Sequence, residues 1–82
     1  MTTKHLTQRQ VRTWMVRRVA ELLKVAPEAV SPQAVFGELG LSSLQAVQLA
    51  AELEEFTGRQ ISATVVYEYP TIEEAAAYAA GA

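Results

Sequence analysis

Residues 36–49 read FGELGLSSLQAVQL, a stretch in which the end of a loop runs directly into an amphipathic pattern. Gly40 comes before a short Leu-Ser-Ser segment, and Ser42 stands three residues before Gln45. A serine followed three positions later by a glutamine is typical of a capping box, in which both side chains bind backbone N–H groups at a helix start. The stretch therefore predicts a helix that begins at Ser43.

The predicted helix extends to Thr57 and has two separate apolar surfaces. Gly58 supplies the left-handed conformation that commonly ends a helix. At helical spacing, the larger apolar surface consists of Ala46, Leu49, Ala50, Leu53 and Phe56. The polar side consists of Gln45, Gln48, Glu52 and Glu55. A smaller apolar strip, away from the larger surface, consists of Leu44, Val47 and Ala51.

A second capping box precedes an N-terminal helix. Thr7 stands three residues before Gln10, and apolar residues then recur at helical spacing, which predicts a helix from about Gln8 to Leu23. Residues 1–24 carry six Lys or Arg and one Glu, a balance of +5, whereas residues 25–82 carry one Arg and eight Glu, a balance of −7. Such asymmetry is typical of an electrostatic docking face or, more simply, of the solvated side of an amphipathic helix.

The connection between these two helices is long for so small a chain. Pro27 and Pro32 prevent a long helix in residues 24–41, which connect the two helices. Apolar residues nevertheless recur through the segment, namely Val25, Val30, Val35, Phe36 and Leu39. We therefore expect the connection to pack across the helices, with a short turn near Pro27–Val30.

The C-terminal third predicts one short and one longer helix. Residues 62–67 favour a strand by propensity, but no second segment is a convincing partner strand, so a short helix is the better interpretation. Pro70 ends that helix. Thr71 and Glu74 form a third capping box, which predicts a helix from Ile72 to about Ala80.

Together these segments predict a single all-α domain over residues 1–82. It is a four-helix bundle with a short third helix and a long loop between the first and second helices. A chain of this length buries one small core, and residues 1–6 are expected to form a flexible N-terminus. The aromatic residues expected in the core are Trp14, Phe36, Phe56 and Tyr67.

The composition excludes several kinds of chemistry. The chain has no Cys and no Asp, which excludes disulfides, cysteine-ligated zinc and cysteine nucleophiles. Its one histidine, His5, lies in a segment expected to fray, and no cluster has the spacing of metal ligands. A serine nucleophile needs an adjacent base, and neither Ser42 nor Ser43 has one nearby in the sequence. We therefore expect a protein that is not an enzyme and has no metal site.

The sequence also predicts where the protein works. No segment approaches the roughly 18 to 20 consecutive apolar residues that span a bilayer. Met1 to Thr7 is polar and lacks the apolar stretch of a secretory signal. We expect a cytoplasmic protein that does not bind membranes.

Two blocks of the sequence resemble acyl carrier domains of polyketide synthases. Residues 36–49 are similar to that family's signature, F-x-E-L-G-L-D-S-L-x-A-V-x-L, and residues 67–71, YEYPT, are similar to its V-F-D-Y-P-T stretch. The separation of the two blocks also matches, and the resemblance extends from about Val11 to Ala80. It implies the four-helix fold of acyl carrier proteins.

The resemblance also implies a cofactor and its attachment site. The serine that carries 4'-phosphopantetheine in this family falls on Ser43, directly before Leu44. A phosphopantetheinyl transferase would place the group there from coenzyme A with Mg²⁺, and its terminal thiol would hold acyl or polyketide intermediates as thioesters. Ser42 stands where the family usually has Asp; it keeps the capping function but leaves a second hydroxyl as a minor rival.

The implied partners are enzymes that act on the carried group. They are the transferase, an acyltransferase or other acyl-loading enzyme, a ketosynthase and further polyketide-pathway enzymes, and the carrier is expected to be a monomer. The residues expected to contact them are Leu44, Gln45, Val47, Gln48 and Glu52. Leu44 and Val47 have an equal alternative, which is to pack under the long loop.

Other interpretations remain at this point. A peptidyl or aryl carrier of nonribosomal peptide synthesis usually has a second Gly where Leu41 stands, so Leu41 favours the acyl type. A helical protein-interaction or nucleic-acid-binding domain could use the basic N-terminal helix, but the acidic remainder would repel phosphates, so we expect no nucleic-acid partner. A carrier-like domain that is never modified is a third possibility.

Overall fold

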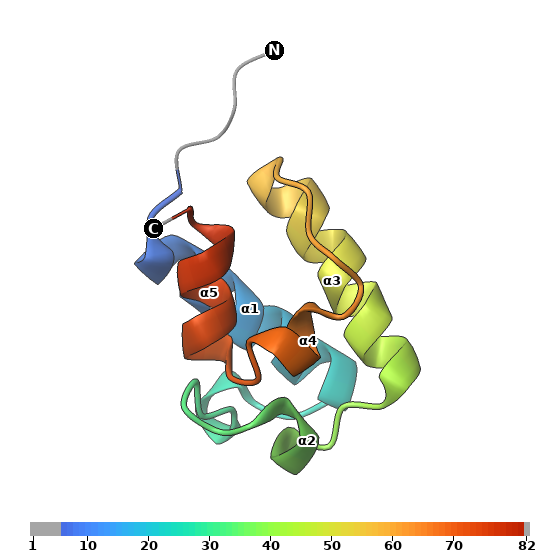
Figure 1. Cartoon of the computed structure of the whole chain (residues 1–82). Coiled ribbons are helices and arrows are strands. Elements are labelled where there is room, and N and C mark those ends of the chain that lie inside the picture. The colour runs from blue at the N-terminus through green and yellow to red at the C-terminus, as the bar shows by residue number, and fades with distance from the viewer. Residues whose placement is uncertain (1–5, 82) are drawn as a thin grey trace.

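The computed structural model describes residues 6–81, which form helices joined by ordered loops (Figure 1). The α-helices are α1 (Gln8–Leu23), α2 (Phe36–Leu39), α3 (Ser43–Thr57), α4 (Val65–Glu68) and α5 (Ile72–Ala79), and Pro27–Ala29 form a 3₁₀ turn, η1. The described residues contain no strand, and the predicted all-α fold is confirmed. The predicted four helices are α1, α3, α4 and α5.

Capping residues begin the long helices where the sequence predicts. The Gln10 backbone N–H donates to Thr7 Oγ1 at 3.1 Å, and the Thr7 N–H donates to Gln10 Oε1 at 2.8 Å, so the first capping box is complete. At α5 only half of the predicted box is present. The Glu74 N–H donates to Thr71 Oγ1 at 3.1 Å, but the Thr71 hydroxyl itself donates to the Glu74 carboxylate.

The segment of ambiguous propensity is helical, as predicted, although only over Val65–Glu68. Val65 and Val66 are buried with 1% and 5% exposure. Their β-branched side chains therefore fill the core beside α3, and no neighbouring strand is needed to accommodate them. α5 ends at Ala79, one residue before the predicted end.

The loop between α1 and α3 contains a helical turn that the sequence did not predict. Phe36 begins α2 and is 3% exposed, so one apolar anchor fixes this turn to the core. The Phe36 backbone N–H donates to Pro70 O at 2.8 Å, and the Glu73 N–H donates to Pro32 O at 3.0 Å. These bonds tie the loop to the α4–α5 connection and to the first turn of α5, which explains why it is ordered.

The expectation that the loop packs across the helices is confirmed for three of its five apolar residues. Val30 and Phe36 are buried, and Leu39 packs against the core at partial exposure. For Val25 and Val35 the expectation is wrong, since their side chains are 44% and 43% exposed. The predicted turn near Pro27–Val30 is present as η1.

The core lies between α1, α3 and α5. Its largest fully buried side chains are Val11, Met15, Val19, Leu49, Leu53, Val65 and Ile72. At its edge the rings of Trp14 and Phe56 stack with centroids 4.8 Å apart. Of the N-terminal residues predicted to be flexible, Leu6 packs against the core, and residues 1–5, His5 among them, lie outside the described residues.

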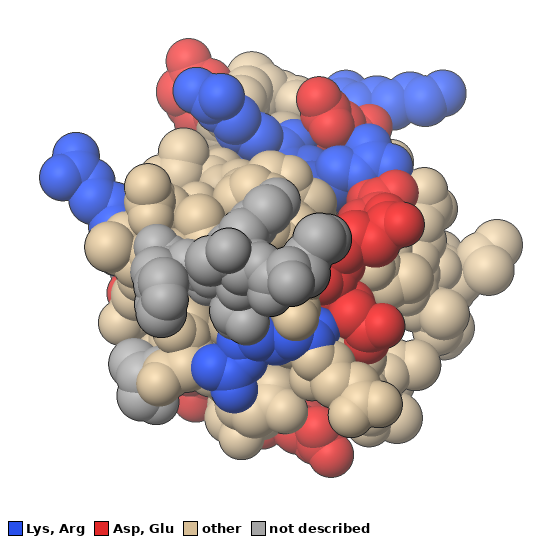
Figure 2. All heavy atoms as spheres, turned by 90° about the horizontal axis from the view of Figure 1, so that it is seen from above, with Lys and Arg blue, Asp and Glu red and all other residues tan. Residues whose placement is uncertain are grey.

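Some of the basic residues of α1 form ion pairs within the fold. Arg12 pairs with Glu73 of α5 at 3.1 Å, and Arg18 binds both Glu52 of α3 and, at 3.1 Å, Glu21 of its own helix. In the view down onto the end where the described chain begins, Lys and Arg project at several places, and many of the acidic side chains lie along one side (Figure 2). Some of the basic side chains of α1 therefore form ion pairs that join helices within the fold.

Two further findings concern membranes and metal ions. None of the helices in the described part of the chain combines the length and apolar character that crossing a bilayer requires. Within residues 6–81, no three metal-ligating side chains lie close enough together to hold a metal ion.

Candidate functional site

Ser43 is the first residue of α3, and its side chain is exposed. Its position is fixed by the residues on either side. Gly40 ends α2 with a φ of 93°, and Ser42 caps α3 by accepting the Gln45 N–H at 3.1 Å. The Gln45 side chain in turn accepts the Ser42 N–H at 2.9 Å, so the predicted capping box is complete.

The hydroxyl of Ser43 is available for chemistry. It makes no hydrogen bond to any other described residue, whereas the Ser42 hydroxyl is occupied by the cap. Backbone N–H groups in the first turn of a helix lack intrahelical acceptors, and the helix dipole places partial positive charge there. A phosphate bound to Ser43 would be stabilised by roughly 0.3–1 kcal/mol at such an exposed position.

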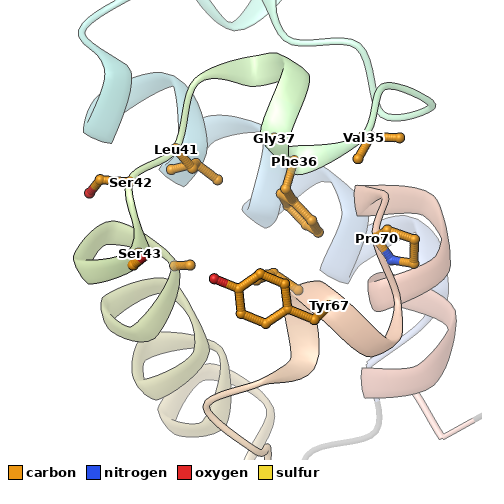
Figure 3. Close-up of a pocket in the computed structure, with 10 residues that line it drawn as sticks. Val35, Phe36, Gly37, Leu41, Ser42, Ser43, Tyr67 and Pro70 are labelled. Atoms are coloured by element: carbon orange, nitrogen blue, oxygen red, sulfur yellow. The ribbon is translucent and has the colours of Figure 1, made fainter.

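A pocket of about 260 Å³ opens beside Ser43, between α2, the start of α3 and α4 (Figure 3). Its walls are largely apolar and include Phe36 from α2, Ala46 from α3 and Val66 from α4. No histidine, lysine, arginine or carboxylate side chain lines it. The pocket therefore offers an accessible hydroxyl beside an apolar hollow.

The expectation that Tyr67 lies in the core is wrong. Its side chain is 69% exposed, and its ring lies at the mouth of the pocket with the hydroxyl directed toward the side where Ser43 lies (Figure 3). The reason is geometric: successive helix residues point about 100° apart, and in the short helix α4 Val66 takes the inward direction. The other three predicted aromatics are buried or half-buried.

Leu44 and Val47 lie on the outer surface of α3. They are 79% and 48% exposed, so the alternative that they pack under the long loop is wrong. Ala51, one turn further along, is also exposed. Large apolar side chains at this exposure, next to Ser43, form an apolar strip that another protein can cover.

The three polar residues predicted to meet partners differ in their surroundings. Gln48 is exposed, and its amide donates to Glu52 at 3.3 Å. Gln45 is half-buried; besides capping α3, it donates from its side chain to Leu22 O at 3.1 Å. Glu52 is half-buried against Arg18. Gln45 and Glu52 are therefore engaged in holding α3 to α1.

The ion pair changes the acidity of Glu52. The Arg18 guanidinium donates two hydrogen bonds to this carboxylate, one of them at 2.9 Å from Nη2 to Oε2. These bonds hold the pKa of Glu52 below its usual value and outweigh the opposing effect of partial burial. Glu52 is consequently charged at neutral pH in the folded protein.

Comparison with protein families identifies the class of site. The family model described as "Phosphopantetheine attachment site" matches residues 13–79. The matched region includes the start of α3, the pocket and α5. An exposed, unbonded serine hydroxyl at a helix start beside an apolar pocket suits covalent attachment of such a group.

Curated relatives are much longer than this chain. One component of the phenolphthiocerol/phthiocerol polyketide synthase of Mycobacterium tuberculosis is 38% identical over 64 residues, which are 78% of this chain and 3% of the relative. Erythronolide synthase EryA3 of Saccharopolyspora erythraea is 35% identical over 74 residues, 89% of this chain and 2% of the relative. The chain thus spans only a few per cent of the length of these relatives.

Solved structures of carrier proteins share the fold. A free-standing peptidyl carrier protein from Acinetobacter baumannii superposes with a TM-score of 0.82 at 30% identity, covering 87% of this chain and 89% of that one. The HMG-ACPI domain of CurA from Lyngbya majuscula gives a TM-score of 0.83 at 23% identity, covering 99% and 85%. The second likeness supports the fold alone.

Proposed function

Because the chain belongs to the phosphopantetheine attachment site family, a family of carrier domains with covalently bound 4'-phosphopantetheine, we propose that Ser43 is the residue that receives this group. The observation that carries the proposal is the environment of its hydroxyl. It is exposed, forms no hydrogen bond to another described residue and stands at the first turn of α3 beside the apolar pocket. A modifying enzyme can reach it without unfolding the domain.

Ser43 is preferred over the adjacent Ser42 for a structural reason. The Ser42 hydroxyl accepts the Gln45 N–H at 3.1 Å and so begins α3. Attachment there would put a bulky group on the capping oxygen and weaken the helix start by about 1 kcal/mol. Attachment at Ser43 leaves the cap intact.

The domain itself is proposed to be a non-catalytic carrier. The attached group supplies a terminal thiol that holds an acyl chain as a thioester, so a chain without cysteine takes part in thiol chemistry. The contribution of the protein is to position and present the attachment point. α3 fixes Ser43 at the surface, and no histidine, lysine or carboxylate side chain of the described residues lines the pocket beside it.

We propose polyketide-pathway enzymes as the partners and acyl or polyketide chains as the cargo. The curated relatives that support this are polyketide synthases, and Leu41 favours the acyl type of carrier. The likeness to a peptidyl carrier protein at 30% identity favours a second candidate, a carrier of aminoacyl or peptidyl groups. Loading assays with acyl and aminoacyl donors would separate these two.

The exposed part of α3 beside Ser43 is the proposed contact surface for these enzymes. Leu44, Val47 and Gln48 are exposed there. We propose that the phosphopantetheinyl transferase, the acyl-loading enzyme and the ketosynthase dock on this strip. Leu44→Glu should slow modification at least several-fold, because it puts a charge into an apolar contact. Thr13→Glu, an exposed position on α1, is the matched control and should leave the rate unchanged.

Intact-mass analysis tests the attachment site. The chain is incubated with coenzyme A, Mg²⁺ and a phosphopantetheinyl transferase of broad specificity. One added phosphopantetheine is expected, abolished in Ser43→Ala and retained in Ser42→Ala. The reverse pattern would transfer the site to Ser42, and no added mass on the unsubstituted chain would refute the proposed function.

A further inference from the structure

Tyr67 is placed differently from the other tyrosines. It is 69% exposed, although the preceding Val66 is only 5% exposed. Tyr69 and Tyr78 stack on one another with ring centroids 4.4 Å apart. The ring of Tyr67 takes part in no such pair, and its hydroxyl has no hydrogen-bond partner among residues 6–81. The Tyr67 phenol is therefore available to a group bound at the surface.

The position of this side chain indicates where such a group would lie. Tyr67 and Ser43 come from different helices, α4 and α3, and line the same pocket (Figure 3). Most of the lining is apolar, and Phe36, Ala46 and Pro70 belong to it. Polar side-chain groups lie at the rim, where the Tyr67 phenol is a free donor. The pocket thus combines apolar walls with one side chain that can fix orientation, as small-molecule sites do.

The size of the pocket limits what can occupy it. Its volume of about 260 Å³ is below the roughly 300–1,000 Å³ typical of sites that enclose a drug-sized ligand. It cannot take the whole prosthetic group together with a long acyl chain. It is large enough for one segment, and the segment nearest to it is the one bonded to Ser43.

The chemistry of that segment matches the pocket. Next to the phosphodiester, phosphopantetheine has a carbon with two methyl groups, followed by a hydroxyl and an amide carbonyl. The methyl groups suit the apolar walls, and the oxygens can accept a hydrogen bond. We infer that this first segment of the group docks in the pocket, with its dimethyl carbon against Phe36 and one of its oxygens bound by the Tyr67 hydroxyl.

This inference rests on the proposed attachment at Ser43 and gives the attached group a resting position. The root of the group lies against the protein, while its distal part and thiol extend beyond the small pocket. Docking is reversible, because one hydrogen bond and a few apolar contacts at a half-open site hold it. Partner enzymes that take up the group therefore have little to displace.

The test uses the full chain carrying phosphopantetheine that is ¹³C-labelled in its two methyl groups. Intact mass first establishes attachment, and nuclear Overhauser effects between the labelled methyl groups and the Phe36 ring then report docking. Phe36 is unchanged in every variant, so the readout does not depend on the substituted ring. Nuclear Overhauser effects between the labelled methyl groups and the Phe36 ring are expected in the unsubstituted chain.

Tyr67→Phe removes only the hydroxyl and should reduce the ratio of docked to free group about five-fold, which corresponds to about 1 kcal/mol. Tyr78→Phe is the matched control, since Tyr78 lies in the stacked pair away from the pocket, and it should leave the ratio unchanged. Nuclear Overhauser effects of equal strength in Tyr67→Phe and in the unsubstituted chain would overturn the role of the hydroxyl. If intact mass shows the attached group but no nuclear Overhauser effect reaches Phe36, the docking is overturned. If intact mass shows no attached group, the proposed function is refuted instead.

Discussion

Gly40 shows how a single residue positions the attachment site. It ends α2 with a φ of 93°, in the left-handed region that residues with a side chain avoid. Three residues later α3 begins, so this turn sets the direction in which Ser43 leaves the loop. Gly37, inside α2, has no positive φ. The two glycines therefore allow backbone conformation to be separated from side-chain volume.

Gly40→Ala should lower the free energy of unfolding by about 1–2 kcal/mol, because the new Cβ makes the left-handed conformation unfavourable. A Cβ at Gly40 or at Gly37 would meet no atom within 4 Å. Gly37→Ala is thus the control, and it should leave stability unchanged or raise it by up to about 1 kcal/mol. Urea unfolding of both variants measures this, and an equal loss in the two would contradict the argument.

At the scale of one element, α3 depends on its N-cap. Ser42 and Gln45 bind one another's backbone N–H groups, as the sequence predicts. The cap and the attachment point are adjacent residues, and each has one task. The start of α3 can therefore be weakened without removing the hydroxyl that we propose to be modified.

Ser42→Ala should destabilise the domain by about 1 kcal/mol, because the Gln45 N–H loses its acceptor. Ser42→Asp keeps an acceptor at the cap and adds a negative charge at the positive end of the helix, so its stability should equal or exceed that of the unsubstituted chain. Thermal unfolding at neutral pH followed by circular dichroism distinguishes the variants. A loss in Ser42→Asp as large as in Ser42→Ala would show that the cap is not the cause.

The pairing of α1 with α3 is sensitive to pH. Arg18 lowers the pKa of Glu52 below its usual 4.5, so the charged carboxylate is favoured in the folded state. Its contribution is full above pH 4.5 and is lost as the pH falls through the lowered pKa of the folded state. Glu52→Gln should cost up to about 1 kcal/mol at pH 7.

Urea unfolding of Glu52→Gln and of the unsubstituted chain between pH 7 and pH 3 measures this. The difference between the two should shrink as the solution becomes more acidic. Glu55→Gln, exposed on the same helix and without an ion pair among the described residues, should change stability at pH 7 by less than about 0.5 kcal/mol. A difference for Glu52→Gln that stays constant over this range would refute the coupling.

For the whole molecule, the decisive packing joins the two ends of the described chain. α5 packs mainly against α1 (Figure 1), and it does so through small side chains. Ala75 and Ala76 have no exposed surface and Ala79 has 1%. Small residues allow the two helices to approach closely, and Arg12 and Glu73 join them at the edge. Because no cysteine can cross-link the chain, this contact depends on packing.

Ala76→Leu should lower the free energy of unfolding by about 1–3 kcal/mol, since three added carbons must fit where the side chain is fully enclosed. Ala77→Leu places the same atoms at a partly exposed position one residue further along α5, and it should cost less than about 0.5 kcal/mol. Urea unfolding again provides the measurement. Equal losses would indicate that helix propensity rather than packing governs this contact.

The predictability of the fold follows the range of the interactions. α1 and α3 have the predicted bounds because their capping partners are three residues apart and the apolar spacing is read within one helix. α2 was not predicted, because its position depends on a distant residue. Phe36, its first residue, donates its backbone N–H to the carbonyl oxygen of Pro70, which lies far along the chain. The weak local signal of α2 is Glu38, whose carboxylate accepts the Val35 N–H at 3.3 Å.

The candidate site divides in the same way. The placing of Ser43 at the start of a helix follows from neighbouring residues, and so does the cap on Ser42. Sequence reasoning expected Tyr67 in the core, because a tyrosine in an apolar segment is usually buried. Its place at the mouth of the pocket depends on Val66 taking the inward direction in α4, which no local pattern specifies.

Local sequence patterns were therefore enough to predict the four main helices, the capped starts of α1, α3 and α5, and the serine that stands at the head of α3. These features depend on hydrogen bonds and periodicity over a few residues, which the order of amino acids specifies directly. Three further features could be seen only in the folded chain: Leu44 and Val47 face outward, Glu52 is bound to Arg18, and Tyr67 shares a pocket with Ser43. Each of these depends on how separate segments pack against one another, and that is settled only when the whole chain is folded.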